Sequence, residues 1–254
     1  MYSYPFQAEP YLPQFEGLID RASHVRMAAS ELLARAPQAA HTSRLIDTRK
    51  ANAFYSSRIE GEDRAQYVAA HEAAEASLNS IGSVGAMSLN STVLQHCHRE
   101  LFSFEDSAEF GSGRWRTQHV KVQRHVPPDF EALPAFLERV DQVYLQPWKS
   151  DAELLIAVAA AHHRMTWIHP FLDGNGRAIR LQSQLALRPL GSSIWSLSAG
   201  LWRRRDDYFR LLAEADSPRL GDLDGRGNLS EKRLAEWCGF FIDVCLEEIH
   251  SAGQ

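Results

Sequence analysis

The segment from Ala152 to Trp167 is apolar on nearly every side and includes the run ELLIAVAAAHH. A helix without a polar face is normally buried, because none of its sides is suited to contact with water. The rest of the chain must therefore supply further helices that surround it. With 254 residues, of which 44% are hydrophobic, the chain is long enough to build such a core.

Helical periodicity recurs on both sides of this segment. The first helix is expected from about Phe15 to Ala36, after an extended arm at residues 1–14, and another is expected to start with Asn90 or Ser91 as its cap and to run through Leu101. Further helices are expected at about residues 43–58, 63–81, 130–144, 152–167, 176–187, 205–215 and 230–250. The sequence therefore predicts one mainly α-helical domain.

Residues 111–126, GSGRWRTQHVKVQRHV, interrupt the helical pattern. Val120, Val122 and Val126 lie two or four positions apart after a glycine-rich turn, which is the alternation of a β-strand. A small β-hairpin is therefore expected beside the helices.

Residues 169–180, HPFLDGNGRAIR, bring a histidine, an acid, a Gly-Asn-Gly turn and two arginines together. Glycines let backbone N–H groups approach a ligand closely, and the helix that begins near Gly176 adds its unpaired N–H groups and its dipole. Arg177 and Arg180 lie one turn apart and supply two guanidinium groups. This combination predicts a site for more than one phosphate.

Asp173 and His169 supply the remaining chemistry of this stretch. A carboxylate repels bound phosphates unless a cation bridges the two, so Mg²⁺ is inferred at Asp173. His169 can both accept and donate a proton near pH 7. Such a site fits phosphoryl or nucleotidyl transfer, whereas the alternative is a capped corner between two helices with a surface salt bridge.

The same stretch resembles the Fic family motif, H-x-F-x-[D/E]-G-N-G-R-x-x-R, and matches it at every specified position. Fic proteins are mainly α-helical, and most characterised types transfer AMP from ATP to a protein hydroxyl. The resemblance implies that His169 is the general base, that Asp173 holds Mg²⁺ and that Phe171 points into the core. The residues that it assigns to the phosphates of ATP are Gly174, Asn175, Gly176, Arg177 and Arg180.

Two further segments are similar to parts of Fic proteins. The expected hairpin resembles the flap that aligns a target peptide by main-chain pairing, and the alternative, favoured where no such motif lies nearby, is a simple surface hairpin. Its candidate residues are Arg116, Thr117, Gln118, His119 and Val120. The segment DYFRLLAEAD resembles the helix that closes over adenine through Tyr208 and Phe209, with Asp216 where the family often has asparagine. These two aromatic residues could equally belong to the core.

The stretch SSRIEG at residues 56–61 resembles the Fic inhibitory motif [S/T]-x-x-x-E-[G/N], with Ser56, Glu60 and Gly61 at the specified places. The resemblance implies that Glu60 pairs with Arg180 and puts negative charge where the γ-phosphate of ATP binds. The alternative is that Glu60 is a solvated acid at a helix C-terminus, a position that the helix dipole disfavours.

The resemblance also divides the chain. Residues 1–85 would form an N-terminal helical region that carries the inhibitory helix. Residues 86–215 would form the catalytic core, and residues 216–254 a C-terminal helical extension.

The composition limits the expected partners and the cellular compartment of the protein. A net charge of −5 gives no general attraction to nucleic acid or to anionic membranes. Three cysteines without paired spacing suit a reducing compartment, and neither a signal peptide nor an apolar run of membrane-spanning length is visible. We therefore expect a cytoplasmic protein with neither a nucleic acid nor a membrane as partner.

Together these features predict a protein adenylyltransferase that uses ATP and Mg²⁺ and is restrained by Glu60. Its partner would be a protein with an exposed Ser, Thr or Tyr hydroxyl, and this chain itself is one candidate target. A homodimer is a candidate assembly. The alternatives are an enzyme that removes AMP from proteins or performs both reactions, a different donor, and a non-catalytic module that senses nucleotides.

Overall fold

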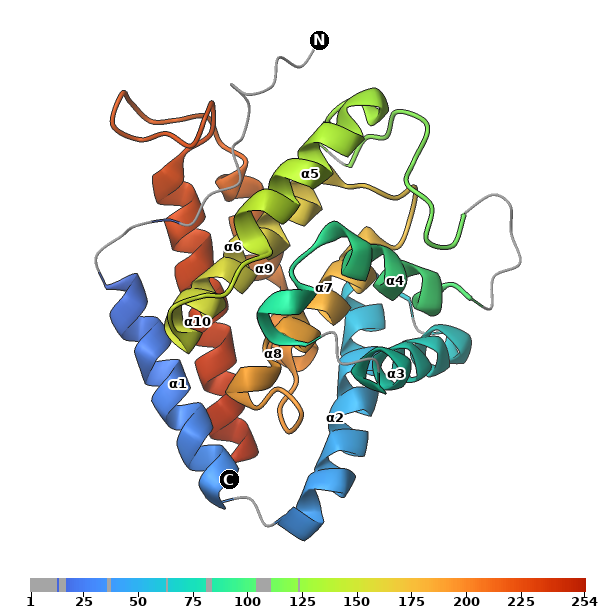
Figure 1. The fold of residues 1–254 in the computed structure, drawn as a ribbon, viewed down its shortest axis with the longest axis vertical. Helices are drawn as coiled ribbons and strands as arrows, with labels where there is room; N and C mark the ends of the chain where they lie inside the picture. The colour runs from blue at the N-terminus through green and yellow to red at the C-terminus, as the bar shows by residue number, and fades with distance from the viewer. Residues whose placement is uncertain are drawn as a thin grey trace.

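The computed structural model describes residue 13 and residues 17–35, 38–62, 64–80, 84–103, 111–122 and 124–254. Its α-helices are α1 (Leu18–Arg35), α2 (Gln38–Ile59), α3 (Ala65–Ser80), α4 (Ser91–Leu101), α5 (Leu133–Tyr144), α6 (Asp151–Ile168), α7 (Asn175–Ala186), α8 (Leu197–Arg203), α9 (Arg205–Ala215) and α10 (Glu231–Ala252). Short 3-10 helices lie between them: η1 (Gly85–Ser88), η2 (Phe130–Ala132) and η3 (Arg188–Leu190). The mainly α-helical fold is thus confirmed (Figure 1).

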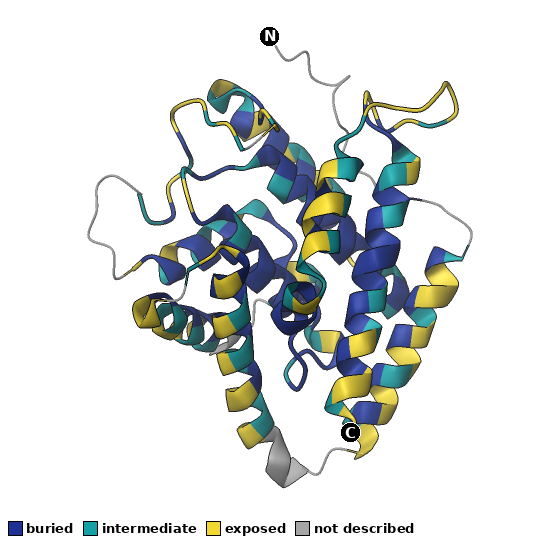
Figure 2. Ribbon diagram, turned by 180° about the vertical axis from the view of Figure 1, so that it is seen from behind, coloured by how far each residue is buried: buried dark blue, intermediate teal, exposed yellow. Residues whose placement is uncertain are grey.

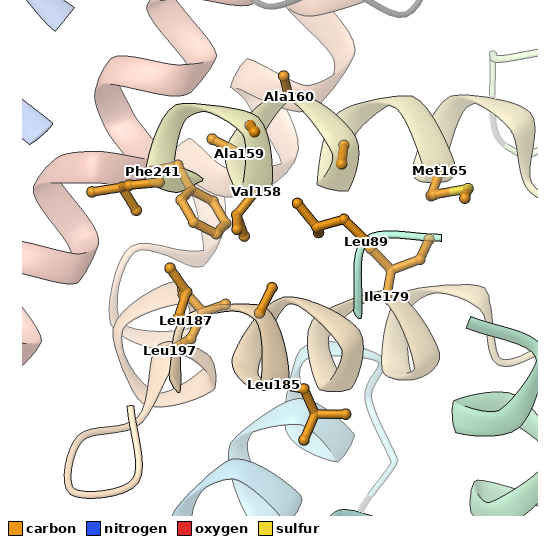
Figure 3. Close-up of a cluster of buried hydrophobic side chains, with 14 of the residues drawn as sticks. Leu89, Val158, Ala159, Ala160, Met165, Ile179, Leu185, Leu187, Leu197 and Phe241 are labelled. Carbon is orange, nitrogen blue, oxygen red and sulfur yellow. The ribbon is translucent and has the colours of Figure 1, made fainter. Parts of the chain in front are cut away.

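Helices α6 and α7 form the centre of the molecule. Between Ala152 and Ile168 every residue of α6 except Glu153 and Thr166 is buried, as the pattern without a polar face predicts. Side chains of α6, such as Val158, and of α7, such as Ile179, meet in one apolar cluster that Phe241 of α10 also joins (Figure 3). The pair is therefore a rigid base for the loop that connects it.

The outer helices cover this pair from two sides. In Figure 1, α1 and α10 lie side by side on the left, and α2, α3 and α4 lie on the right. The outward faces of the outer helices carry the exposed residues, whereas the central helices are almost wholly buried (Figure 2). No helix among the described residues has both the length and the apolar character that a membrane crossing requires.

Several helix ends follow their local sequence. The side chain of Asn90 accepts a hydrogen bond from the Val93 N–H at 2.9 Å, so Asn90 rather than Ser91 is the N-cap of α4.

The expected arm at residues 1–14 lies outside the described residues, except for residue 13. Helix α8 was not predicted, because it has seven residues and contains Gly200.

The expected β-hairpin at residues 111–126 is not shown as two strands. Within its described residues there is one antiparallel bridge, in which Val122 and His125 exchange hydrogen bonds of 3.0 and 2.9 Å. Upstream, the N–H of Arg116 donates to the carbonyl of Pro170 at 2.8 Å, and its side chain donates to the carbonyl of His169 at 2.9 Å. Contacts with the loop after α6 therefore replace ladder contacts within the segment.

A buried polar network fastens α2 to its neighbours. Glu75 of α3, which is fully buried, pairs with Arg188 at 2.7 Å and accepts a hydrogen bond from Asn52 of α2 at 3.2 Å. Asn52 in turn accepts a hydrogen bond from Ser196, the N-cap of α8, at 2.6 Å. Because these groups are removed from water, each depends on its protein partners.

We predict that Glu75→Ala lowers the free energy of unfolding by roughly 3 kcal/mol, because removing one member of a buried ion pair leaves the other uncompensated. Urea denaturation followed by circular dichroism measures the change. Glu72→Ala, on the partly exposed side of the same helix, is the control and should change stability by less than about 0.5 kcal/mol. Equal losses in the two variants would contradict a special role of the network.

Candidate active site

The loop between α6 and α7 is shaped by two residues in the left-handed region. His169 ends α6 with a φ of 50°, and Gly174 precedes α7 with a φ of 73°. Among the described residues, His169 is the one non-glycine residue with a positive φ, which is a strained conformation. Its N–H still donates to the carbonyl of Met165 at 3.0 Å, so the end of α6 fixes where the imidazole lies.

Asn175 holds the loop together from within. Its Oδ1 accepts a hydrogen bond from the Phe171 N–H, and its Nδ2 donates to the Phe171 carbonyl, both at 2.9 Å. Phe171 is fully buried, as expected. The side chain of Asn175 is thus occupied by the loop, and its backbone N–H remains to face a ligand at the start of α7.

His98 is a functional candidate that sequence reasoning missed. Its Nε2 lies 2.9 Å from the carbonyl oxygen of Asp173, and its Nδ1 accepts a hydrogen bond from the Gly113 N–H at 2.9 Å. The ring also stacks on Phe171 with the centroids 3.8 Å apart. No sequence pattern reveals this role, because α4 and the loop are 75 residues apart in the chain.

His169 is poised to accept a proton. Burial lowers its pKa to about 4, and the nearby charges of His125 and Arg116 act in the same direction. Its Nδ1 is buried and has no hydrogen-bond partner among the described residues. The imidazole is therefore neutral near pH 7, which is the form that a general base requires.

Arg177 presents unused donors beside an exposed acid. Its guanidinium packs over the rings of Tyr67 and Phe102 at 4.4 and 4.7 Å, while its Nε and Nη1 are buried and lack hydrogen-bond partners within the described residues. The Asp173 carboxylate lies 3.6 Å away and is 55% exposed. This arrangement suits an anion at Arg177 and a cation at Asp173.

Arg180 is buried, and its strongest hydrogen bonds are with Ser56 of α2 and with Glu60, which directly follows α2. Its Nη2 donates to the Glu60 carboxylate at 2.6 Å and to the Ser56 carbonyl at 2.9 Å, and its Nε donates to the Ser56 hydroxyl at 3.0 Å. Burial alone would raise the pKa of Glu60, but the charge and hydrogen bond of Arg180 lower it below its usual value. The structure thus brings together Ser56, Glu60 and Arg180, three residues that the sequence had linked only by resemblance.

Gly61 ends the helix that carries Glu60. Its φ is 78°, its N–H donates to the carbonyl of Arg58 at 3.0 Å, and the N–H of Glu62 donates to the carbonyl of Ser57 at 3.0 Å. This pair of bonds is the Schellman motif, in which glycine is favoured at the left-handed position. Gly61 therefore acts by stopping α2 where Glu60 meets Arg180.

Two cavities meet at Glu60. An apolar cavity of about 170 Å³ is lined by Phe209, Leu212 and Trp167, among others. A polar cavity of about 150 Å³ is lined by Asp173 and Arg177, among others. Both share Glu60, His169, Asn175 and Gly176, and a Cβ placed on Gly176 would lie only 2.1 Å from Oε1 of Glu60. The Glu60 carboxylate thus lies directly on the first turn of α7, at the junction of the cavities.

The two aromatic residues of α9 face the site differently. Phe209 is 36% exposed at the wall of the apolar cavity. Tyr208 is buried, and its hydroxyl lies 3.1 Å from Nε2 of His162 and 3.5 Å from Nη1 of Arg180. Asp216, at the same cavity, accepts from Nε2 of His163 at 2.9 Å.

The segment expected to bind a target lies beside the loop. Arg116 is buried and anchored to it, whereas Thr117, Gln118 and His119 are exposed and Val120 is partly buried. The residues that reach the apolar cavity from this segment are Val122 and His125. His125 was not singled out from the sequence, because its contact with the cavity depends on the tertiary fold.

Within the described residues, no group of three or more His, Cys, Asp or Glu side chains could hold a metal ion alone. A magnesium ion at Asp173 would thus depend on the phosphates for its other ligands, which is common for this ion. The exposed carboxylate of Asp173, which faces the polar cavity, fits such a site.

Acid should destabilise the protein through its buried histidines. Burial lowers the pKa of His71 to about 3 and the pKa values of His98, His163 and His169 to about 4. Between these values and the unfolded value of 6.5, the unfolded chain binds more protons, so stability is present above pH 6.5 and is lost as the pH falls. Differential scanning fluorimetry should show Tm falling by at least roughly 5 °C from pH 7 to pH 5. A flat profile would contradict neutral burial of these rings.

Comparison with known proteins gives this geometry a context. Residues 88–187 match the Fic/DOC family model. The chain is 33% identical over 94 residues to "Protein adenylyltransferase Fic" of Drosophila willistoni, which covers 37% of this chain and 18% of that protein. It is 31% identical over 122 residues to the protein of the same name from Nematostella vectensis, covering 47% of this chain and 27% of that protein. The chain thus spans less than a third of the length of these relatives.

Solved structures show the same fold over nearly the whole chain. A Fic family protein from Desulfovibrio desulfuricans G20 has a TM-score of 0.66 at 19% identity, covering 96% of this chain and 76% of that one. Fic-1 (aa134–508) from C. elegans has a TM-score of 0.69 at 16% identity, covering 93% and 71%. At these identities the structures support the fold alone.

Proposed function

We propose that this chain, which is a Fic family protein, transfers AMP from ATP to a hydroxyl group of a target protein and is restrained by Glu60. The observation that carries the proposal is the meeting of three features at one helix start. These are the neutral base His169, the unused donors of Arg177, and Arg180 occupied by an internal carboxylate.

The two cavities suit the two halves of ATP. The polar cavity at the start of α7 offers backbone N–H groups and Arg177 to a phosphate chain. The adjoining apolar cavity offers the ring of Phe209 to a base. A magnesium ion at Asp173, when bound, would neutralise phosphate charge, which removes the conflict between that carboxylate and the phosphates.

The side chains account for each proton and bond in the transfer. His169 accepts the proton of the target hydroxyl, and the hydroxyl oxygen forms a bond to the α-phosphorus. The bond from that phosphorus to the bridging oxygen of the β-phosphate breaks, and pyrophosphate leaves. The target is a protein with an accessible hydroxyl, and this chain itself is included among the candidates.

The restraint follows from charge. While Glu60 pairs with Arg180, the carboxylate lies on Gly176 at the first turn of α7. A γ-phosphate directed at Arg180 would be repelled by the negative charge of Glu60. It would also find the guanidinium of Arg180 already donating to that carboxylate. ATP bound beside this pair would therefore be turned away from the geometry that in-line attack requires.

A second candidate reaction is the removal of AMP from a modified protein. It is favoured by the position of Glu60, which borders both cavities together with His169 and could orient a water molecule between them. An adenylylated target incubated with wild type and with Glu60→Gly separates the reactions, because hydrolysis by this route requires Glu60.

We predict that Glu60→Gly raises label transfer from [α-³²P]ATP to protein at least roughly tenfold, since a lost ion pair of this kind commonly shifts an equilibrium by that factor. Adding His169→Ala to this variant should abolish the transfer. Mass spectrometry should therefore find the mass of AMP on the target after incubation with Glu60→Gly, and not after incubation with the Glu60→Gly/His169→Ala double variant. His24→Ala, on an exposed face of α1, is the matched control. Absence of transfer in Glu60→Gly would refute the proposal.

A further inference from the structure

Arg205, the first residue of α9, contacts the end of the inhibitory helix. Its Nε donates a hydrogen bond to the carbonyl of Ile59 at 3.2 Å. Ile59 is the last residue of α2 and directly precedes Glu60. The final carbonyls of a helix have no partner within it, and those of Ser57 and Arg58 are satisfied by the turn at Gly61. Arg205 supplies the hydrogen-bond donor for the carbonyl of Ile59, which follows them in the chain.

A row of alternating arginine and aromatic side chains reinforces this contact. The guanidinium of Arg205 lies over Phe209 at 4.9 Å and over Trp202 at 6.0 Å. Arg58 of α2 lies over the same Trp202 at 5.5 Å and over Phe54 at 5.4 Å. These cation–π contacts join the last turn of α2 to α8 and α9 on the outer side of the site.

Charge explains why the last turn needs an external cation. The carbonyl dipoles at the C-terminus of α2 disfavour the carboxylate of Glu60, which follows directly. Arg180 compensates the carboxylate from the inner side at 2.6 Å. Arg205 places a second guanidinium at the carbonyl of Ile59 from the outer side, so the turn lies between two cations.

We propose that Arg205 is a positioning residue of the restraint, which holds the last turn of α2 through the main chain of Ile59 and so fixes where Glu60 meets Arg180. This inference rests on the proposed function, and it identifies the last turn of α2 as the place where the pairing of Glu60 with Arg180 is released. The network of Asn52 and Glu75 keeps the preceding turns of α2 on the core, so release is a local loosening of residues 56–61.

The test compares Arg205→Ala with Arg210→Ala. Arg210 lies on the same helix but pairs with Asp207 and Glu214, and it serves as the matched control. Arg205→Ala should raise label transfer from [α-³²P]ATP by roughly three- to tenfold, because a charged hydrogen bond commonly shifts an equilibrium by up to that factor. Arg205→Met, which keeps the apolar stem, should do the same if the hydrogen bond rather than packing is responsible.

Hydrogen exchange provides a readout that does not depend on activity. Amides of residues 56–62 should exchange faster in Arg205→Ala than in wild type, while those of residues 48–53 stay unchanged. Unchanged exchange at residues 56–62 would overturn the role of Arg205. Faster exchange there, with no transfer activity in any variant, would support this role and refute the proposed function instead.

A double variant separates positioning of Glu60 from a direct part in transfer. If Arg205 acts only through Glu60, then Glu60→Gly and Glu60→Gly/Arg205→Ala should transfer label equally well. A fall of tenfold or more in the double variant would overturn the proposal, because it would place Arg205 in the reaction itself.

Discussion

The site is organised around a cation that is buried and must be paired. Arg180 is 1% exposed, and an isolated guanidinium at such a depth would be strongly unfavourable. The fold supplies acceptors from two directions: Ser56 of α2 with Glu60 directly after it, and the hydroxyl of Tyr208 of α9. Arg180 thus links α7 to the end of α2 and to α9.

The pairing also determines which parts of the molecule can change. Loop residues 169–174 are fixed by Asn175 and His98, and α6 and α7 are buried almost throughout. These contacts hold His169 and the start of α7 in one fixed geometry relative to each other. The contact of Glu60 is different: it joins an exposed helix end to the buried cation, and a phosphate group offers Arg180 an equivalent partner. In the proposed function, the fixed loop and α7 would perform the reaction, and the end of α2 would determine whether a carboxylate or a phosphate pairs with Arg180.

Sequence reasoning reached those features that are local in the chain. Long periodic helices have their information in adjacent residues, so the apolar α6 was predicted from its pattern, while the burial of Phe171 was implied by the resemblance of the twelve-residue motif to that of Fic proteins. Helix α8 was missed because seven residues give too little periodicity. Residues 111–126 were predicted as a hairpin from their alternating valines, yet the backbone N–H of Arg116 bonds to Pro170 and its side chain bonds to His169, both in the loop after α6. The roles of His98 and Arg205 depend on partners far along the chain, and no spacing encodes them.

Under the proposed function, the pairing of Arg180 with Glu60 would place the control of the site at the C-terminal end of α2. Helix ends lack intrahelical partners, and each substitute contact at the end of α2 is individually modest: the glycine turn, the hydrogen bond from Arg205 and the cation–π row. A ligand shifts a two-state equilibrium only by its difference in affinity for the two states. If a phosphate replaced the Glu60 carboxylate as the proposal holds, Arg180 would still be paired with an anion, so the net loss of charge pairing would be small. Under the proposed function, a small difference in binding energy at the helix end is therefore sufficient to exchange the partner of Arg180, whereas detaching the whole of α2 would also break the buried hydrogen bonds of Asn52 with Glu75 and Ser196.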